Sequence, residues 1–257
     1  MNILSHSNQF NRLIGKLNTK SSKLTSQKTQ KMKYFVLASL ASQGVFAGLD
    51  QIASVADEEL ATKGATRSVS TILGDQSMAA IRNYGCWCFF DDDHGAGKGA
   101  PVDSVDAMCK NLHMGYDCAM MDYAEATGND DCVPWEVSYN SGMSFGMGAL
   151  VDTCNNVNDD LCAQYACMVE GAFVVNIIGA FLSLGTVNPG NLPQNGFNFR
   201  ESCPVNSGSQ TDERQCCGVL PFRYPYKPVD RECCGAQTYD PSMMDCCADN
   251  VPKFSCV

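Results

Sequence analysis

Positive charge is scarce in most of this chain of 257 residues. Only 18% of the residues are charged, and residues 48–257 hold 11 Lys and Arg against 28 Asp and Glu. We therefore expect no binding to nucleic acid or to anionic membranes through bulk charge, and an acidic surface that attracts cations. Histidine is also rare, because only His94 and His113 follow residue 47, so any imidazole base must be one of these two. No Asn-x-Ser/Thr sequence occurs, so N-glycosylation is not expected.

The first part of the chain differs from the rest in charge. Residues 1–47 contain seven Lys and Arg and no acid, with an apolar run at 34–41 that is too short to span a bilayer. Small residues follow, ending at Ala47. This pattern predicts a signal peptide over 1–47 cleaved after Ala47, with Met32 as an alternative start and a buried helix as the other interpretation. No later apolar run reaches spanning length, so we expect a secreted, extracellular protein with no transmembrane segment.

The 16 cysteines divide equally between residues 86–167 and residues 203–256. Paired cysteines at this density predict disulfides and an oxidising compartment. The second group contains adjacent cysteines at 216–217, 233–234 and 246–247. Neighbouring Cα atoms lie about 3.8 Å apart, which is too close for the usual bridge, so each member of a pair should bond elsewhere. The sequence leaves the connectivity of this group open.

Apolar residues recur with helical spacing in three segments. These are 50–83, as one broken helix or two, then 102–126 and 159–182. The third helix is predicted to begin after Asn158 as N-cap, with acidic residues in its first turn. A mainly α fold is expected.

Glycines and prolines interrupt the pattern at 183–202, which predicts a linker. The chain then divides into a helical domain at 48–182 and a cysteine-rich module at 203–257. The module has little apolar periodicity and is expected to be small, irregular and held by disulfides.

Three motifs in the helical domain resemble those of one enzyme family. Residues 84–88 read YGCWC, residues 97–109 read GKGAPVDSVDAMC and residues 162–170 read CAQYACMVE. Together they resemble the secreted phospholipase A2 family over residues 66–182. The resemblance implies two antiparallel helices clamped by disulfides, a calcium ion, and hydrolysis of the sn-2 ester of a phospholipid by a histidine base that an acid orients.

The resemblance also implies specific disulfides. The bridges that remain are Cys88 to Cys109, Cys132 to Cys162, and Cys154 to Cys167. Two family bridges are missing as whole pairs, because Met108 and Asn176 replace one and Gly115 and Val169 replace the other. Cys86 and Cys118 have no partner in this scheme, so they bond each other or one of them reaches the C-terminal module.

The catalytic positions depart from the family pattern. Without gaps, Leu112 falls at the catalytic histidine position and His113 at the position of the calcium-binding Asp. A shift by one residue makes His113 the base instead. Glu170 stands in place of the orienting Asp, and Tyr116 at a position that hydrogen-bonds this acid. The catalytic candidates are therefore His113, Glu170 and Tyr116, and the same Tyr116–Glu170 bond without a base would be structural.

The segment that resembles the calcium loop is also altered. Phe89 replaces a glycine, and an insertion adds Asp91, Asp92 and Asp93 before His94. Calcium requires several oxygen ligands, for which the candidates are carbonyls of Trp87 and Phe89 with these three carboxylates. The other interpretation is a solvated acidic loop, so calcium is weak or absent at this site.

The sequence favours a secreted phospholipase A2-like protein that is catalytically inactive. Its expected role is that of an extracellular calcium-, matrix- or lipid-binding structural protein. The module at 203–257 loosely resembles the dicysteine repeats of galaxin-like matrix proteins, with ECCG at 232–235 and DCC at 245–247, so partners are phospholipid or an extracellular matrix or mineral surface. The alternatives are an active calcium-dependent phospholipase A2 with His113 as base, and a toxin-like or inhibitory module that binds lipid in the old substrate groove.

Overall fold

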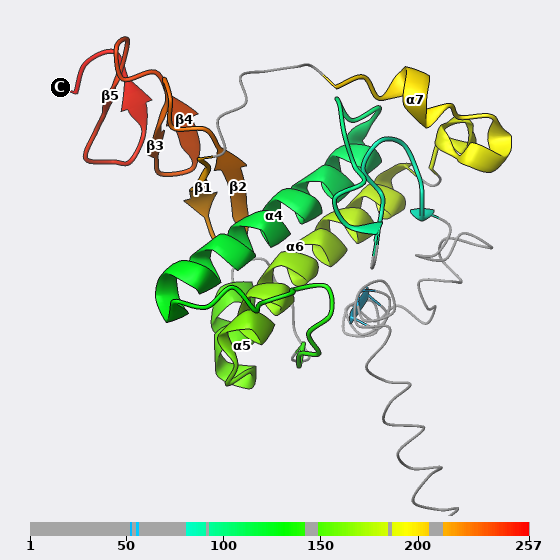
Figure 1. Ribbon diagram of the computed structural model, residues 1–257, viewed down its shortest axis with the longest axis horizontal. Coiled ribbons are helices and arrows are strands. Elements are labelled where there is room, and N and C mark those ends of the chain that lie inside the picture. The colour runs from blue at the N-terminus through cyan, green and yellow to red at the C-terminus, as the bar shows by residue number, and fades with distance from the viewer. Residues whose placement is uncertain are drawn as a thin grey trace, which may run out of the picture. The chain divides into compact units, whose positions relative to one another are not determined.

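The protein is described by a computed structural model, which covers residues 52, 55–56, 81–90, 93–141, 149–184, 187–205 and 213–256. Two long helices, α4 (Ser104–Thr127) and α6 (Leu161–Leu184), form its main body with the short helix α5 (Leu150–Val157). The β-strands of the described residues form small hairpins near the C-terminus (Figure 1). The predicted signal peptide, its cleavage site and Met32 lie outside the described residues, as does most of the predicted helix over 50–83.

Helix α4 begins and ends where its sequence provides caps. The side chain of Asp103 accepts a hydrogen bond from the Asp106 backbone N–H, which would otherwise have no partner in the first turn. At the other end, Gly128 adopts φ 75° and donates its N–H to the Ala124 carbonyl. The helix predicted over 102–126 is thus confirmed to within about two residues.

The N-cap predicted for α6 is wrong. Asp160, not Asn158, accepts a hydrogen bond from the backbone of the first turn, at 2.8 Å from the Ala163 nitrogen. Asn158 instead closes the end of α5, where its side chain donates to the Cys154 carbonyl and accepts from the Asn140 N–H. A polar residue shared between two helices can cap either, and here the tertiary contact with Asn140 decided its role.

Helices α4 and α6 run antiparallel and pack closely. Gly115 lies against Val169, and Met108, two turns earlier in α4, borders the same cavity as Asn176, two turns later in α6. A Cβ atom on Gly115 would lie only 2.7 Å from a Val169 methyl group, so glycine permits this close approach. The positions that the resemblance paired as lost bridges therefore do face each other.

Helix α6 is apolar on all sides. Residues Leu161–Ala180 are long and apolar enough by composition to cross a membrane, with a mean hydropathy of 1.6. The expectation that no run after the leader reaches this length is therefore wrong. In this structure 72% of the segment is buried within the protein, which is the pattern of a central core helix.

All 16 cysteines pair in eight disulfides. The structure contains Cys88–Cys109, Cys132–Cys162 and Cys154–Cys167, the three bridges that the resemblance implied. Cys86 bonds Cys203 and Cys118 bonds Cys216, so both of the unassigned cysteines reach the C-terminal part of the chain. None of the eight bridges joins α4 directly to α6. Eight disulfides indicate an oxidising environment.

The segment predicted as a linker is bonded to the helical body in its described part. It contains two single-turn 3₁₀ helices, η3 (Pro189–Asn191) and η4 (Pro193–Asn195), and helix α7 (Phe199–Ser202). The Asn191 carbonyl accepts from the Gly85 N–H at 2.9 Å, and its amide donates to Asp103 at 2.8 Å. Val187 and Leu192 are buried in the core.

The prediction of an irregular C-terminal module is wrong. The module consists of three antiparallel hairpins. They pair β1 (Gln215–Val219) with β2 (Phe222–Tyr226), β3 (Glu232–Cys234) with β4 (Gln237–Tyr239), and β5 (Asp245–Cys246) with β6 (Pro252–Lys253). The strands are too short and too exposed to produce a clear alternating pattern in the sequence.

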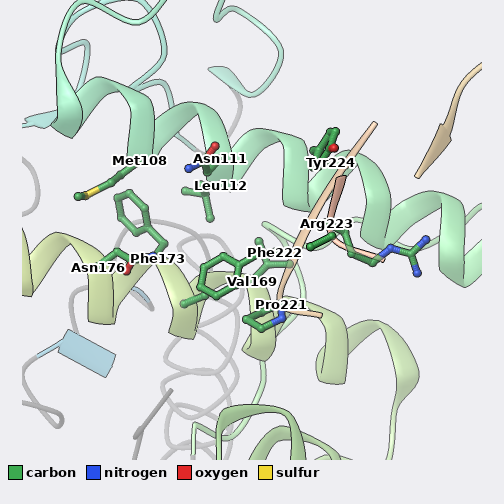
Figure 2. Close-up of a pocket in the computed structure, with 12 residues that line it drawn as sticks. Met108, Asn111, Leu112, Val169, Phe173, Asn176, Pro221, Phe222, Arg223 and Tyr224 are labelled. Atoms are coloured by element: carbon green, nitrogen blue, oxygen red, sulfur yellow. The ribbon is translucent and has the colours of Figure 1, made fainter. Parts of the chain in front are cut away.

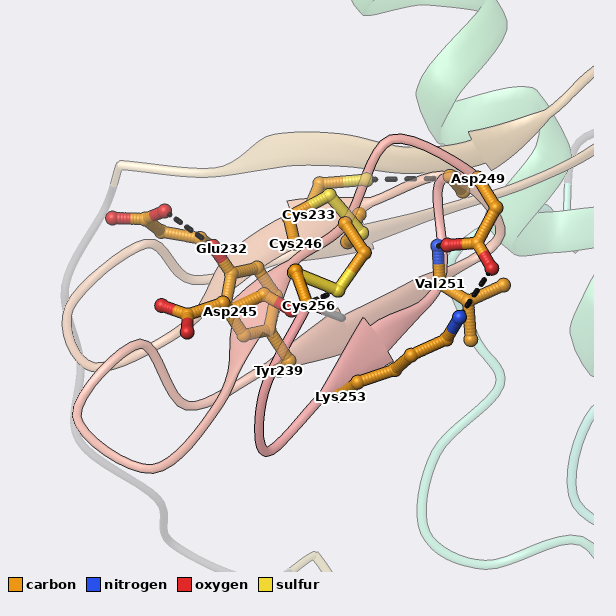
Figure 3. The surroundings of a disulfide bond; sticks show 12 residues. Glu232, Cys233, Tyr239, Asp245, Cys246, Asp249, Val251, Lys253 and Cys256 are labelled. Carbon is orange, nitrogen blue, oxygen red and sulfur yellow. Dashed lines mark hydrogen bonds and ion pairs between the residues drawn. A yellow bond between two sulfur atoms is a disulfide. The ribbon is translucent and has the colours of Figure 1, made fainter.

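Disulfides connect these hairpins in a regular order, shown in part in Figure 3. In each adjacent pair the first cysteine bonds to a residue earlier in the chain and the second to one later. The bridges in order are Cys118–Cys216, Cys217–Cys233, Cys234–Cys246 and Cys247–Cys256. We call this arrangement the cysteine ladder. Its first bridge fixes the module to α4, and β2 packs against the same helix.

Candidate functional site

Glu170 lies on α6 with 1% of its surface exposed. One carboxylate oxygen accepts a hydrogen bond from the Tyr116 hydroxyl at 2.6 Å, and the other accepts from the Tyr139 hydroxyl at 2.6 Å. Tyr116 is on α4, whereas Tyr139 comes from the loop before α5. Burial, followed by the nearby Glu170 carboxylate, raises the pKa of Tyr139 well above its ordinary value. Tyr139 therefore remains a protonated donor at neutral pH.

His113, also on α4, forms a second buried polar contact. Its Nδ1 lies 2.8 Å from Nδ1 of His94, so one imidazole donates and the other accepts. The two rings are nearly parallel, with centroids 4.7 Å apart. The His94 ring also stacks on Trp135, with ring centroids 3.9 Å apart, and His94 Nε2 lies 3.7 Å from Asp117. The inserted loop thus brings His94 onto α4 rather than leaving it in solvent.

The surroundings of His113 keep its imidazole neutral. Burial, and then the proximity of His94, lower the pKa of His113 to about 4. The carbonyl groups of Trp87 and Phe89 oppose this shift without making a hydrogen bond to Nε2. That nitrogen is buried and has no partner among the described residues.

The predicted catalytic residues are therefore divided between two clusters. Tyr116 and Glu170 are hydrogen-bonded as predicted, but His113 pairs with His94 and makes no hydrogen bond to Glu170 among the described atoms. Leu112, the alternative at the base position, is buried and aliphatic. Among the described residues, the buried Glu170 carboxylate bonds two tyrosine hydroxyls and no imidazole.

A buried carboxylate fixes the loop next to His113. Asp106 accepts hydrogen bonds from the backbone N–H groups of Cys86, Trp87 and Val102, at 2.7–2.9 Å. Burial raises the pKa of Asp106, against the effect of these three donors. Gly85 is required beside it, because its φ is +59° and a Cβ atom would lie 2.5 Å from the Asp106 carboxyl carbon.

The structure describes three of the five residues predicted as calcium ligands, namely Trp87, Phe89 and Asp93. The Trp87 carbonyl already accepts from the Phe89 N–H at 2.8 Å, and Asp93 is exposed. Asp91 and Asp92 lie outside the described residues. Within the described ranges no group of three or more His, Cys, Asp or Glu side chains is placed to hold a metal. Calcium takes six to eight oxygen ligands, of which the described residues of the loop account for a part.

Several residues of this region carry no recognisable signal in the sequence. Tyr139 and Trp135 lie in a loop without periodicity, so nothing marked them as partners of Glu170 and His94. Asn191 was assigned to a linker, although its amide also donates to the Tyr84 hydroxyl. Burial, followed by the bond to Asp103, raises the pKa of Tyr84 to about 12.

Neither a protein-family model nor a curated protein sequence matches this chain. The structure by itself defines a disulfide-rich protein with two long packed helices and a ladder of small hairpins.

Proposed function

We propose that this chain is a secreted phospholipase A2-like protein that does not hydrolyse phospholipids and acts as an extracellular binding and structural protein. The observation that carries the proposal is the separation of the two clusters. His113 is bonded to His94, while both oxygens of Glu170 accept from tyrosine hydroxyls. The protein contains two long packed helices, as the resemblance implies, and His113 makes no hydrogen bond to Glu170 among the described atoms.

The acid–base properties of His113 support loss of catalysis. A general base works best when its pKa is close to the working pH, and the pKa of His113 is near 4 because the ring is buried. Among the described residues, no group of three or more His, Cys, Asp or Glu side chains is placed to hold the calcium ion that would polarise an ester carbonyl. Glu170 with its two tyrosines then serves to hold α4, α6 and the intervening loop together.

The proposed binding role rests on surface charge and on the tail. Residues 48–257 carry 28 acidic against 11 basic residues, which favours weak, multivalent contacts with calcium or a calcium-containing mineral. The cysteine ladder supports a structural role, since closely spaced bridges hold a module with little apolar core. A galaxin-like matrix function is the specific form of this proposal.

The decisive experiment measures hydrolysis of phosphatidylcholine in mixed micelles, with calcium and with a chelator. We expect no turnover from the oxidised protein or from His113→Gln, while an active secreted phospholipase A2 serves as positive control. Calcium-dependent turnover that His113→Gln abolishes would establish the hydrolase alternative instead.

A binding panel then tests the second half of the proposal. Sedimentation with phosphatidylcholine vesicles and with calcium carbonate particles, together with calcium titration, should show low-affinity, saturable association with at least one of them. Absence of association with all three would refute the binding role, whatever the micelle assay shows.

A further inference from the structure

A cavity of about 240 Å³ lies between α4, α6 and the turn that joins β1 to β2 (Figure 2). Leu112 from α4, Phe173 from α6 and Phe222 from β2 all border it. None of the residues of the Glu170 cluster or of the His94–His113 pair lines this space. It is therefore a separate feature of the fold, and what it binds does not depend on the proposed function.

The cavity occupies a part of the helix pair that no bridge crosses. Met108 and Asn176 stand at the two positions that form one disulfide in the family that the sequence resembles. Both residues line the cavity, so no disulfide joins the two helices at this point. The first hairpin covers this gap from the outside, and the Cys118–Cys216 bridge holds the hairpin on α4. The walls are thus fixed independently of any ligand, which favours a preformed site.

The chemistry of the lining selects against charged ligands. Arg223 is the one charged residue among the described residues that line the cavity. Its Nη1 lies 3.1 Å from Asp122 and its Nη2 donates to the Cys216 carbonyl, so its charge is already compensated. Figure 2 shows its guanidinium group directed away from Leu112 and Phe173.

The other polar groups of the lining are the Tyr224 hydroxyl, which accepts from the Thr238 N–H at 3.0 Å, the buried Nε of Arg223, which has no hydrogen-bond partner among the described residues, and two neutral amides. Asn111 is exposed and Asn176 is half-buried, so both lie on the solvent side, whereas Leu112, Val169 and Phe173 are buried. An apolar interior with a few polar groups at its edge is the usual composition of a small-molecule site. An uncharged ligand with an apolar body and at most one weak hydrogen-bonding group matches this lining.

The volume limits the size of the ligand. A dry cavity of about 150 Å³ lined by aliphatic and aromatic side chains is large enough for benzene. We infer that this cavity is a binding site for one small uncharged apolar molecule, either a single substituted aromatic ring or a short aliphatic chain. A complete phospholipid is too large to enter it.

The test uses toluene and 1-hexanol as neutral probes and hexanoate as the charged counterpart, titrated into the oxidised full chain and followed by NMR. We expect one-to-one saturable binding of the neutral probes, and binding of hexanoate at least tenfold weaker than that of 1-hexanol. The Asn176→Phe variant places a ring in the cavity and should weaken toluene binding at least tenfold. Asn155→Phe, on an exposed part of α5, is the matched control and should bind as the unmodified protein does.

Intermolecular NOEs keep the test independent of the variants. Toluene protons should show contacts to the methyl groups of Leu112 and Val169 in the unmodified protein, even if Asn176→Phe fails to fold. Absence of saturable binding, equal weakening by both phenylalanine variants, or NOEs to residues elsewhere would overturn the inference.

Discussion

Nδ1 of His113 and Nδ1 of His94 lie 2.8 Å apart, and the His94 ring packs against the rings of Trp135 and Tyr116. Asp117 is the acid that faces this pair, through Nε2 of His94. The arrangement makes folding stability depend on pH through His113.

We expect the protein to lose stability as the pH falls from about 6.5 towards 4. The pKa of His113 is about 4 in the folded protein against 6.5 for the free side chain, so the unfolded chain takes up the proton first. The contribution of His113 to the free energy of unfolding is fully present above pH 6.5. About 3 kcal/mol of it is lost once the pH is below 4. Urea unfolding at several pH values measures it. His113→Gln removes the titrating group, and an unchanged pH profile in that variant would contradict the assignment.

Removing the hydroxyl group of Tyr139 should lower the free energy of unfolding, although the substitution deletes only one oxygen atom. Tyr139→Phe leaves one oxygen of a buried carboxylate without this donor, which costs about 1–3 kcal/mol. Chemical unfolding measures the loss. Tyr226→Phe is a matched control, because the Tyr226 hydroxyl bonds Gln215 at an exposed site, and it should change stability by less than about 0.5 kcal/mol. Equal effects of the two substitutions would show that Glu170 does not need Tyr139.

A disulfide should form between cysteines placed at positions 115 and 169. A Cβ atom on Gly115 would lie 3.5 Å from the Val169 Cβ, within the spacing usual for a bridge. We expect Gly115→Cys with Val169→Cys to fold with no free thiol and to gain about 2–4 kcal/mol. Thiol titration and mapping of non-reduced peptides measure the pairing. Val169→Cys alone should leave one thiol, and exchange with a native bridge in the double variant would count against the close packing of α4 on α6.

The sequence was sufficient for the two long helices but not for what surrounds them. Apolar spacing located α4, because Val105, Leu112 and Tyr116 lie on one face of it. The bridges Cys86–Cys203 and Cys118–Cys216 could not be predicted from the sequence. They join residues that are 117 and 98 positions apart, and no local signal connects such positions. The hairpins were missed because their strands contain two to five residues, too few for a pattern of period two.

The candidate site was predictable in part. The bond between Tyr116 and Glu170 was implied by the resemblance, in which the residue at the Tyr116 position hydrogen-bonds the acid at the Glu170 position. The partner of His113 did not follow, because it comes from an inserted loop whose path depends on stacking between His94 and Trp135. Residues on loops take their positions from tertiary contacts, and these are absent from a linear pattern.

The cysteine ladder has a consequence for how such a tail can evolve. Because each adjacent pair bonds once backward and once forward, a hairpin can be duplicated or deleted together with its pair and every cysteine still finds a partner. Cys247–Cys256 closes the series at one end and Cys118–Cys216 at the other. Tail length is thereby uncoupled from the helical body, so the reach of the protein can change by whole hairpins without a new core.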